Sequence, residues 1–204
     1  PRSRGLGDVY KRQATQCLQA AAAVGQSEMM FLYDKLFSEY GVIVSQLLFT
    51  YDELQNPESK THLVNTINQL LEYDCLPIMN ENDSVSVEEL LNGDNDCLSA
   101  SVAVFSEADL LVLLTDTDGL YDGNPSENPN AKLIKQVDII DDNIKSITGS
   151  AGARGTGGFI TKINAAEIAV SAGVPVVITN GKKPTDIYKI LNGEPVGTYF
   201  KAVK

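Results

Sequence analysis

Short apolar runs alternate with segments of helical periodicity along most of this chain. Four runs rich in β-branched and other apolar residues are typical of strands: 42–50, 76–79, 110–114 and 174–179. Helices are predicted at 14–40 (with Gly25 as an interruption), 61–73, 96–108 and 163–172, and shorter strands at 132–137 and 197–200. This alternation predicts an α/β fold, a three-layer αβα sandwich with a mainly parallel open sheet.

Polar residues gather just after three of the predicted strands. They follow Met79, Leu114 and Thr179. Ligands of parallel α/β sheets bind in loops beyond the carboxyl ends of the strands. The sequence therefore predicts that a functional site lies among these loops.

Two Asn/Asp clusters lie between the strand predicted at 76–79 and the helix predicted at 96–108. Asn80 to Asp83 follow the strand, and Asp94 to Asp96 stand at the start of the helix. Asn and Asp are favoured helix caps and turn residues, so both clusters have a purely structural interpretation. A second interpretation is a site for a ligand that carries an ammonium group and a carboxylate, because the clusters supply carboxylates and carboxamides together. The residues alone leave both interpretations open.

A glycine-rich segment, GSAGARGTGGFITK, runs from Gly149 to Lys162. Backbone N–H groups of such a loop, followed by a helix N-terminus, form an anion cradle. Lys162 falls in the first turn of the predicted helix, where the helix dipole disfavours a cation, so a bound phosphate explains it better. A flexible surface loop is the alternative, and the segment matches neither Walker A nor G-x-G-x-x-G.

The strand at 110–114 runs into Thr115-Asp116-Thr117-Asp118-Gly119. This segment has three interpretations: a turn, a calcium loop, or the edge of a nucleotide site with Asp116 or Tyr121 near adenine or ribose. The glycine is at the wrong position for an EF-hand loop, and a strand precedes it rather than a helix. A turn and a nucleotide edge therefore remain.

Charge and composition restrict the partners. The net charge of −11 over 204 residues argues against nucleic acid or an anionic membrane as a partner. Cys17, Cys75 and Cys97 are expected to be reduced thiols in or near the core of a cytoplasmic protein, and His62 to lie on a helix surface or at a cap. Residues 1–13 are basic and lack an apolar period, so we expect a disordered or non-native leader.

Together these segments resemble the amino acid kinase family, and within it the glutamate 5-kinase branch. TDTDGLYDGNP after the strand and GTGGFITK at 155–162 resemble motifs that the family's kinases for aspartate, acetylglutamate and UMP share. The more specific resemblance lies in MNENDSV at 79–85 and GDNDCLSA at 93–100, with AAVGQ at 22–26 and GTYF at 197–200. It extends over about residues 13–202.

The resemblance implies ATP-dependent phosphorylation of the side-chain carboxylate of L-glutamate to γ-glutamyl phosphate, the first step of proline biosynthesis. It implies that Asp83 and Asn95 bind glutamate with Asn80 close by, that Lys162 is catalytic, and that Asp96 positions catalytic lysines. It also implies Mg²⁺ with ATP, proline as an inhibitor, and a homodimer or homotetramer. The implied ATP-binding residues are Thr115, Asp116, Thr156, Gly157, Gly158, Phe159, Ile160, Thr161 and Lys162.

The sequence lacks two motifs of the family: the opening K-x-G-S strand described next, and a second strand ending in a T-S-G-A-like turn that contacts substrate. The family opens with a strand ending in K-x-G-S, whose lysine contacts the transferred phosphoryl group, and residues 1–13 contain no such motif. We therefore expect 14–204 to be a kinase domain that is partial at its N-terminus and has no C-terminal RNA-binding-like domain. The 204 residues alone are expected to have little or no activity. The alternatives are a non-catalytic remnant that binds ATP, glutamate or proline, and a related kinase of the same fold.

Overall fold

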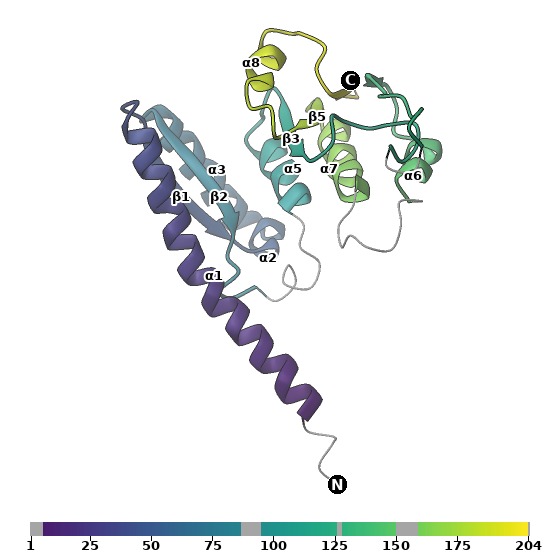
Figure 1. The fold of residues 1–204 in the computed structure, drawn as a ribbon. Helices are drawn as coiled ribbons and strands as arrows, with labels where there is room; N and C mark the ends of the chain where they lie inside the picture. The colour runs from purple at the N-terminus through teal and green to yellow at the C-terminus, as the bar shows by residue number, and fades with distance from the viewer. Residues whose placement is uncertain (1–5, 87–94, 126–127, 150–158, 204) are drawn as a thin grey trace. The chain divides into compact units, whose positions relative to one another are not determined.

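The computed structural model describes residues 6–86, 95–125, 128–149 and 159–203, and their side chains at 15–86, 95–125, 128–147 and 159–203 (Figure 1). The chain divides into two compact units, Pro1–Gly93 and Asp94–Lys204. Each unit is described by itself below. No helix of the described residues combines the length and the apolar character that a membrane crossing requires.

Within its described residues, the first unit contains three helices and a two-stranded parallel sheet. Its elements are α1 (Leu6–Ser38), β1 (Ile43–Phe49), α2 (Tyr51–Gln55), α3 (Pro57–Glu72) and β2 (Cys75–Glu81). Helix α1 packs against β1, and α3 packs against β2. Both predicted strands and the predicted helix at 61–73 are confirmed.

Helix α1 departs from the prediction in two ways. It begins at Leu6, so residues 6–13 are helical and not disordered, and it passes through Gly25 without a break. A single glycine inside a helix costs only about 1 kcal/mol, and the alanines and other strong helix formers around Gly25 offset that cost.

Asn56 explains how α2 and α3 meet. Its side-chain oxygen accepts hydrogen bonds from the backbone N–H groups of Glu58 and Ser59, at 2.9 and 3.1 Å. Pro57 then occupies the first turn of α3, where its missing N–H is not needed. Helix α2 was not predicted from the sequence, because five residues are too few to show a helical period.

The second unit contains a four-stranded sheet with the strand order β3-β5-β6-β4. Strands β3 and β5 are parallel, β4 and β6 are parallel, and β5 and β6 are antiparallel. The elements are α5 (Asn95–Phe105), β3 (Leu111–Thr115), β4 (Gln136–Val137), α6 (Asp142–Gly149), α7 (Phe159–Ser171), β5 (Val176–Asn180), α8 (Asp186–Leu191) and β6 (Thr198–Phe200). The mainly parallel α/β pattern is confirmed, but the described strands form two sheets and not one, and the strand predicted at 132–137 is reduced to Gln136–Val137.

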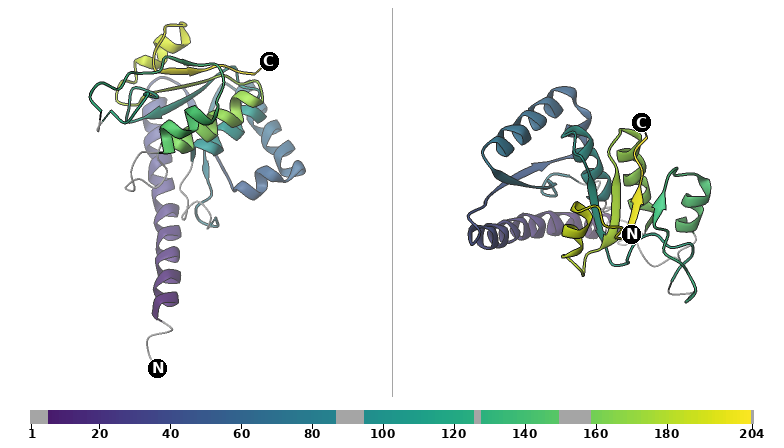
Figure 2. Two further views of the ribbon diagram at one scale, coloured as in Figure 1. Left: turned by 90° about the vertical axis from the view of Figure 1, so that its right-hand side faces the viewer. Right: turned by 90° about the horizontal axis from the view of Figure 1, so that it is seen from above.

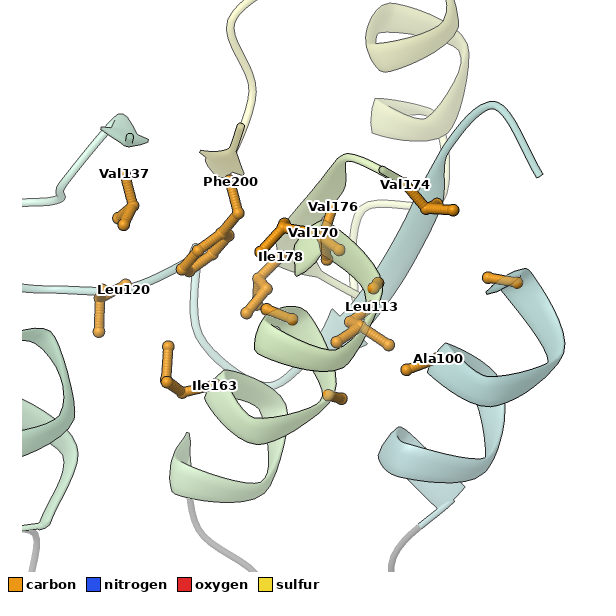
Figure 3. Close-up of a cluster of buried hydrophobic side chains, with 14 residues drawn as sticks. Ala100, Leu113, Leu120, Val137, Ile163, Val170, Val174, Val176, Ile178 and Phe200 are labelled. Carbon is orange, nitrogen blue, oxygen red and sulfur yellow. The ribbon is translucent and has the colours of Figure 1, made fainter. Parts of the chain in front are cut away.

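The hydrophobic core of the second unit lies between the sheet and helices α5 and α7 (Figure 3). Ile163 of α7, Ile178 of β5 and Phe200 of β6 are completely buried in it. Helices α5 and α7 lie side by side, and each also packs against a strand of the sheet (Figures 1 and 2). This packing fixes the first turns of both helices relative to the ends of β3 and β5.

Helix α7 ends as the sequence predicts, at a glycine. Gly173 has a positive φ of 93°. Its N–H donates to the carbonyl of Val170, and the N–H of Val174 donates to the carbonyl of Ala169. This pattern is a Schellman motif, which turns the chain from α7 into β5.

The cysteine and histidine predictions are partly confirmed. All three cysteines are free, but Cys17 is exposed on α1, so the prediction of a near-core position is wrong for that residue. Sequence periodicity could not place it, since α1 is rich in alanine and shows no sharp apolar face. His62 lies on the exposed surface of α3, 4.0 Å from Glu58 one turn earlier, as predicted.

Candidate functional site

Asp96 and Lys162 form the central ion pair of the second unit. The Nζ atom of Lys162 lies 2.9 Å from Oδ2 of Asp96, and the two side chains are only 17% and 20% exposed. Asp96 lies in the first turn of α5 and Lys162 in the first turn of α7. The pair therefore joins the N-terminal ends of the two helices.

The sequence explains why the two side chains meet. Ala100 and Ala103 follow Asp96 at i+4 and i+7, and Ala166 and Ala169 follow Lys162 at the same spacings. Residues at these spacings lie on one face of a helix. All four alanines are buried in the core, so small side chains let α5 and α7 approach closely along the faces that carry the ion pair.

Thr161 makes a second hydrogen bond to Asp96. Its Oγ1 donates to Oδ2 of Asp96 at 2.8 Å, so Asp96 holds two consecutive residues of α7. Phe159 is the first residue of α7; its side chain is partly buried and packs against the hydrophobic core. Ile160 is the second residue of the helix. Of the predicted ATP-binding residues, Thr156, Gly157 and Gly158 lie outside the described residues.

Thr115 and Asp116 lie at the carboxyl end of β3, as predicted. Thr115 closes β3 opposite Asn180 of β5, and its carbonyl accepts a hydrogen bond from the N–H of Gly181 at 2.8 Å. The exposed carboxylate of Asp116 accepts a hydrogen bond from the Thr115 hydroxyl at 3.2 Å. Short connections lead from α5 into β3 and from α7 into β5, so the helix N-termini point toward this same edge of the sheet.

Asp118 links the loops that follow β3 and β5. It accepts hydrogen bonds from Nδ2 of Asn180 at 2.9 Å and from Nζ of Lys183 at 3.3 Å. These two donors, with the Asn180 bond first, hold the pKa of Asp118 below its ordinary value. Neither Asn180 nor Lys183 was predicted as a site residue, although both follow a predicted strand end.

Gly119 fixes the start of the next loop. A Cβ atom at Gly119 would lie 2.6 Å from Oγ1 of Thr198, so this backbone must approach β6 closely. The buried Thr198 hydroxyl accepts from the N–H of Leu120 at 2.8 Å and donates to the carbonyl of Ile134 at 2.6 Å. These contacts support the turn interpretation of TDTDG.

In the first unit, a compact turn follows β2. Asn80 and Glu81 are the last two residues of the strand, and the N–H of Asn82 continues the pairing by donating to the carbonyl of Phe49 at 3.0 Å. The N–H of Ser86 donates to the Asn82 carbonyl, and the Ser86 hydroxyl donates to the buried carboxylate of Glu81. These contacts give the cluster a fixed turn, as its structural interpretation expects.

Asp83 and Asn80 present their polar groups on this turn. Burial of Asp83, and then the nearby Glu81 carboxylate, raise the pKa of Asp83 above its ordinary value of 3.8. Asn80 donates from Nδ2 to Oε1 of Gln26 in α1, at 3.0 Å. Residues 87–94, which follow this turn, lie outside the described residues.

Asn95 is the first residue of α5, and its side chain is exposed. It belongs to the second unit, whereas Asn80 and Asp83 belong to the first, so each group is described within its own unit. Sequence reasoning missed Gln26, Glu81 and Ser86 as supports of the turn. Gln26 stands in the AAVGQ segment, and its pairing with Asn80 depends on the packing of α1, which no local pattern reveals.

The two groups differ in chemistry. The first turn of α7 offers an ammonium group and the N-terminal end of a helix dipole, which suit phosphate oxygens. The turn after β2 offers a carboxylate and a carboxamide, which suit an amino acid. No group of three or more His, Cys, Asp and Glu side chains able to hold a metal ion occurs in the described ranges. A magnesium ion in such a site would be held largely by nucleotide phosphates with one or two carboxylates.

Comparison with known proteins identifies a family and several relatives that this chain resembles. The model of the amino acid kinase family matches residues 3–180. A glutamate 5-kinase of Clostridium acetobutylicum is 51% identical over 200 residues, which span 96% of this chain and 75% of that protein. Glutamate 5-kinases of Listeria innocua and Clostridium perfringens are 47% and 46% identical over 91% of this chain, which matches 69% and 71% of their lengths.

Solved structures resemble the fold at low sequence identity. A UMP kinase from Bacillus anthracis has a TM-score of 0.60 and 16% identity, covering 94% of this chain and 70% of that one. An isopentenyl phosphate kinase of T. acidophilum has a TM-score of 0.56 and 17% identity, covering 86% and 67%. At such identities the likeness concerns the fold alone.

Proposed function

This chain belongs to the amino acid kinase family, and from this premise we propose that it transfers the γ-phosphoryl group of ATP to the side-chain carboxylate of L-glutamate. The product is γ-glutamyl phosphate, the first intermediate of proline biosynthesis. One structural observation carries the proposal: Asp96 holds Lys162 at the N-terminal end of α7, directly after the glycine-rich segment. The relatives named glutamate 5-kinase support the choice of substrate.

The second unit supplies the ATP side of this proposal. Lys162 neutralises charge on the transferring phosphoryl group, and Asp96 positions Lys162. A lysine ammonium has three donors, and the bond to Asp96 uses one of them. Residues 156–161 and the strand end at Thr115 and Asp116 bind the nucleotide, whose phosphates carry Mg²⁺.

The turn after β2 supplies the glutamate side. Asp83 and Asn80 offer oxygen acceptors for the α-ammonium group. The resemblance to glutamate 5-kinases assigns Asn95, the first residue of α5, to glutamate as well. We propose Asp83 as the main ammonium partner, because its carboxylate is charged and the Asn80 carboxamide is not.

The reaction needs no general base from the protein. An oxygen of the ionised glutamate side chain attacks the γ-phosphorus, the bond from that phosphorus to the β-phosphate oxygen breaks, and ADP leaves. The nucleophile has no proton to lose. Positioning and charge neutralisation therefore supply the catalysis, as is general for phosphoryl transfer.

The proposal is tested by trapping the product. The purified chain is incubated with ATP, Mg²⁺, L-glutamate and hydroxylamine, and γ-glutamyl hydroxamate is measured with ADP. Glutamate-dependent formation of both supports the proposal. Equal or faster ADP formation with aspartate, acetylglutamate or UMP in place of glutamate would contradict the substrate assignment.

A second candidate, a non-catalytic protein that binds ATP, glutamate or proline, follows from a specific feature of the sequence. Residues 1–204 contain no K-x-G-S segment, so Lys162 is the single predicted catalytic lysine of this chain. Calorimetric titration with each ligand separates the two candidates, because binding of ATP and glutamate without hydroxamate identifies the non-catalytic protein.

Three further properties belong to the same proposal. Proline acts as an inhibitor at or beside the glutamate site, the chain forms a dimer or tetramer, and the protein is cytoplasmic. Competition between proline and glutamate in the same titrations tests the first. Light scattering during size-exclusion chromatography tests the second.

A further inference from the structure

Two consecutive residues of α7 bind the same oxygen atom of Asp96. Oγ1 of Thr161 lies 2.8 Å from Oδ2 of Asp96, and Nζ of Lys162 lies 2.9 Å from that same oxygen. The Thr161 contact is partly buried, and it joins α7 to α5 across 65 positions of the sequence. Thr161 therefore shares with Lys162 the carboxylate that the proposed function assigns to positioning this lysine.

The direction of the Thr161 hydrogen bond follows from the chemistry of its partner. The ionised carboxylate of Asp96, in its ion pair with Lys162, can only accept, so the hydroxyl donates. A threonine hydroxyl carries one hydrogen, and the phosphate oxygens of ATP are acceptors. While the hydroxyl donates to Asp96, it has no hydrogen for a phosphate. A contact between residue 161 and a phosphate would then come from the backbone N–H, as at other helix N-termini.

The two contacts constrain Asp96 in different ways. Successive side chains of an α-helix project about 100° apart, so Thr161 and Lys162 reach the carboxylate from two directions. A lysine side chain is long and flexible, whereas threonine is short and stiff at χ1. The Thr161 hydroxyl therefore ties the carboxylate to the backbone of α7, which the lysine alone would not do.

Resting on the proposed function, we propose that the Thr161 side chain is a positioning residue for Asp96 and Lys162 and not a ligand of ATP. Its hydroxyl fixes the Asp96 carboxylate, and the carboxylate holds the Lys162 ammonium group where charge develops on the transferring phosphoryl group. A preorganised cation of this kind acts mainly in the transition state. Loss of the hydroxyl should therefore lower kcat and leave the affinity for ATP nearly unchanged.

The kinetic test separates kcat from the affinity for ATP on the full chain. Thr161→Val replaces the hydroxyl with a methyl group and keeps the β-branch. We expect kcat of γ-glutamyl hydroxamate formation to fall about tenfold or more, since misplacing a catalytic group by about 1 Å can cost roughly 10²-fold. The Kd of ATP, measured by calorimetry, is expected to stay within about twofold. Thr161→Ser retains the hydroxyl and is expected to keep most of the parent kcat.

Ser99→Ala is the matched control. Oγ of Ser99 donates to the backbone carbonyl of Asp96 at 2.7 Å, within α5. This variant removes a partly buried hydroxyl that contacts the same residue, but the contacts of the carboxylate stay in place, so kcat should equal that of the parent. In an Asp96→Ala background, Thr161→Val should lower kcat no further, because it acts through Asp96.

A labelling experiment tests the positioning step without turnover. Acetylation of Lys162 by acetic anhydride is followed by mass spectrometry of the peptide that contains it. The Lys162 side chain is only 17% exposed in its ion pair, so a loosened pair should make labelling several-fold faster. We expect this acceleration in Thr161→Val and in Asp96→Ala, and parent-like labelling in Thr161→Ser and Ser99→Ala.

The outcomes separate the inference from the proposed function. Parent-like kcat or parent-like labelling in Thr161→Val, or a Kd for ATP raised about tenfold, overturns the inference and leaves the proposed function intact. A parent chain that forms no hydroxamate contradicts the proposed activity, and labelling then decides whether Thr161 holds the ion pair. If Thr161→Val does not fold, as judged by circular dichroism, Thr161→Ala carries the same expectations and the same contradictions.

Discussion

Lys162 occupies a position that its own helix disfavours. The N-terminal end of α7 carries positive partial charge, and the lysine is largely withdrawn from water. Asp96 offsets both effects through the ion pair. A cation held in this way is already ordered, so binding a phosphate removes little further conformational freedom from it. This is the preorganisation that electrostatic catalysis requires.

We expect Lys162→Met to lower the rate of γ-glutamyl hydroxamate formation by roughly 10²–10³, the usual cost of removing one charge-stabilising donor. The assay described above measures it. Lys135→Met is the matched control, since Lys135 is exposed and forms no ion pair in the described ranges. Equal rates in the two variants would show that Lys162 has no catalytic part.

Asp83 is expected to lower the folding stability of the chain at neutral pH while it contributes to ligand binding. Its raised pKa means that the folded chain binds this proton more tightly than the unfolded chain, so stability falls as pH rises from about 3.8 through the folded-state pKa. The full loss of folding stability caused by the ionised Asp83 is therefore present at pH 7. Asp83→Asn should raise the midpoint of thermal unfolding at pH 7, and the gain should shrink as pH falls toward 3.8.

The same variant should bind L-glutamate about tenfold or more weakly, because it loses a charged hydrogen-bond acceptor. Asp34→Asn removes one negative charge from an exposed position on α1 and serves as the control for net charge. An unchanged glutamate affinity in Asp83→Asn would remove Asp83 from the proposed site. A lower unfolding midpoint at pH 7 would contradict the sign of its electrostatic contribution.

At the residue scale, the sequence predicted where several candidate residues lie in the fold better than it predicted the contacts that support them. Thr115, Asp116 and Lys162 lie at the strand end or helix start where the local pattern placed them. The acceptor on Gln26 and the donors on Asn180 and Lys183 were missed, because each reaches its partner across elements far apart in sequence. No local spacing encodes such a contact.

At the element scale, the long elements were predicted and the short helices were not. The apolar runs of β1, β2, β3 and β5 and the periodic helices α3, α5 and α7 carry enough residues to show their period. Helices α2, α6 and α8 span five, eight and six residues, too few for a clear apolar face. Division of the strands between two sheets depends on tertiary pairing, so the alternation of elements could not predict it.

The connection between α8 and β6 offers a matched pair of glycines. Gly193 and Gly197 both have positive φ, at 78° and 70°. A Cβ atom at Gly193 would meet nothing within 4 Å, whereas one at Gly197 would collide with the carbonyl oxygen of Ile178. Only Gly197 therefore needs glycine for space as well as for conformation.

Gly193→Ala should cost roughly 1 kcal/mol of unfolding free energy, the typical penalty for a side chain in this region. Gly197→Ala should cost clearly more, because β5 and β6 would have to separate to admit the methyl group. Urea denaturation followed by circular dichroism measures both. Similar losses in the two variants would contradict the close approach of β6 to β5.

At the scale of the whole molecule, the two units differ in how much core they contain. The large buried cluster is made entirely of residues from the second unit, with members from α5, α7, β3, β5 and β6. In the first unit, the described buried hydrophobic residues are Phe49, Leu54 and Ile67. Burial of apolar area is the main favourable term in folding, so the second unit should be the more stable one.

Hydrogen exchange on the intact chain tests this difference. The slowest-exchanging amides are expected in β5 and in the buried turns of α7, with β1 and β2 exchanging several-fold faster. Measurement with and without ATP separates intrinsic stability from ligand effects, since a ligand stabilises the unit that binds it. Equal protection of β1 and β5 in the ligand-free chain would contradict the prediction.

The strand order β3-β5-β6-β4 has a consequence for synthesis on the ribosome. Strand β4 pairs only with β6 among the described strands, and β6 follows it after the whole of α6, α7, β5 and α8. Thr198, at the start of β6, also secures the loops that hold Leu120 and Ile134. Strand β4 therefore waits without its partner strand until residues 198–200 have left the exit tunnel, and during that interval it is the part of the nascent second unit most in need of a chaperone.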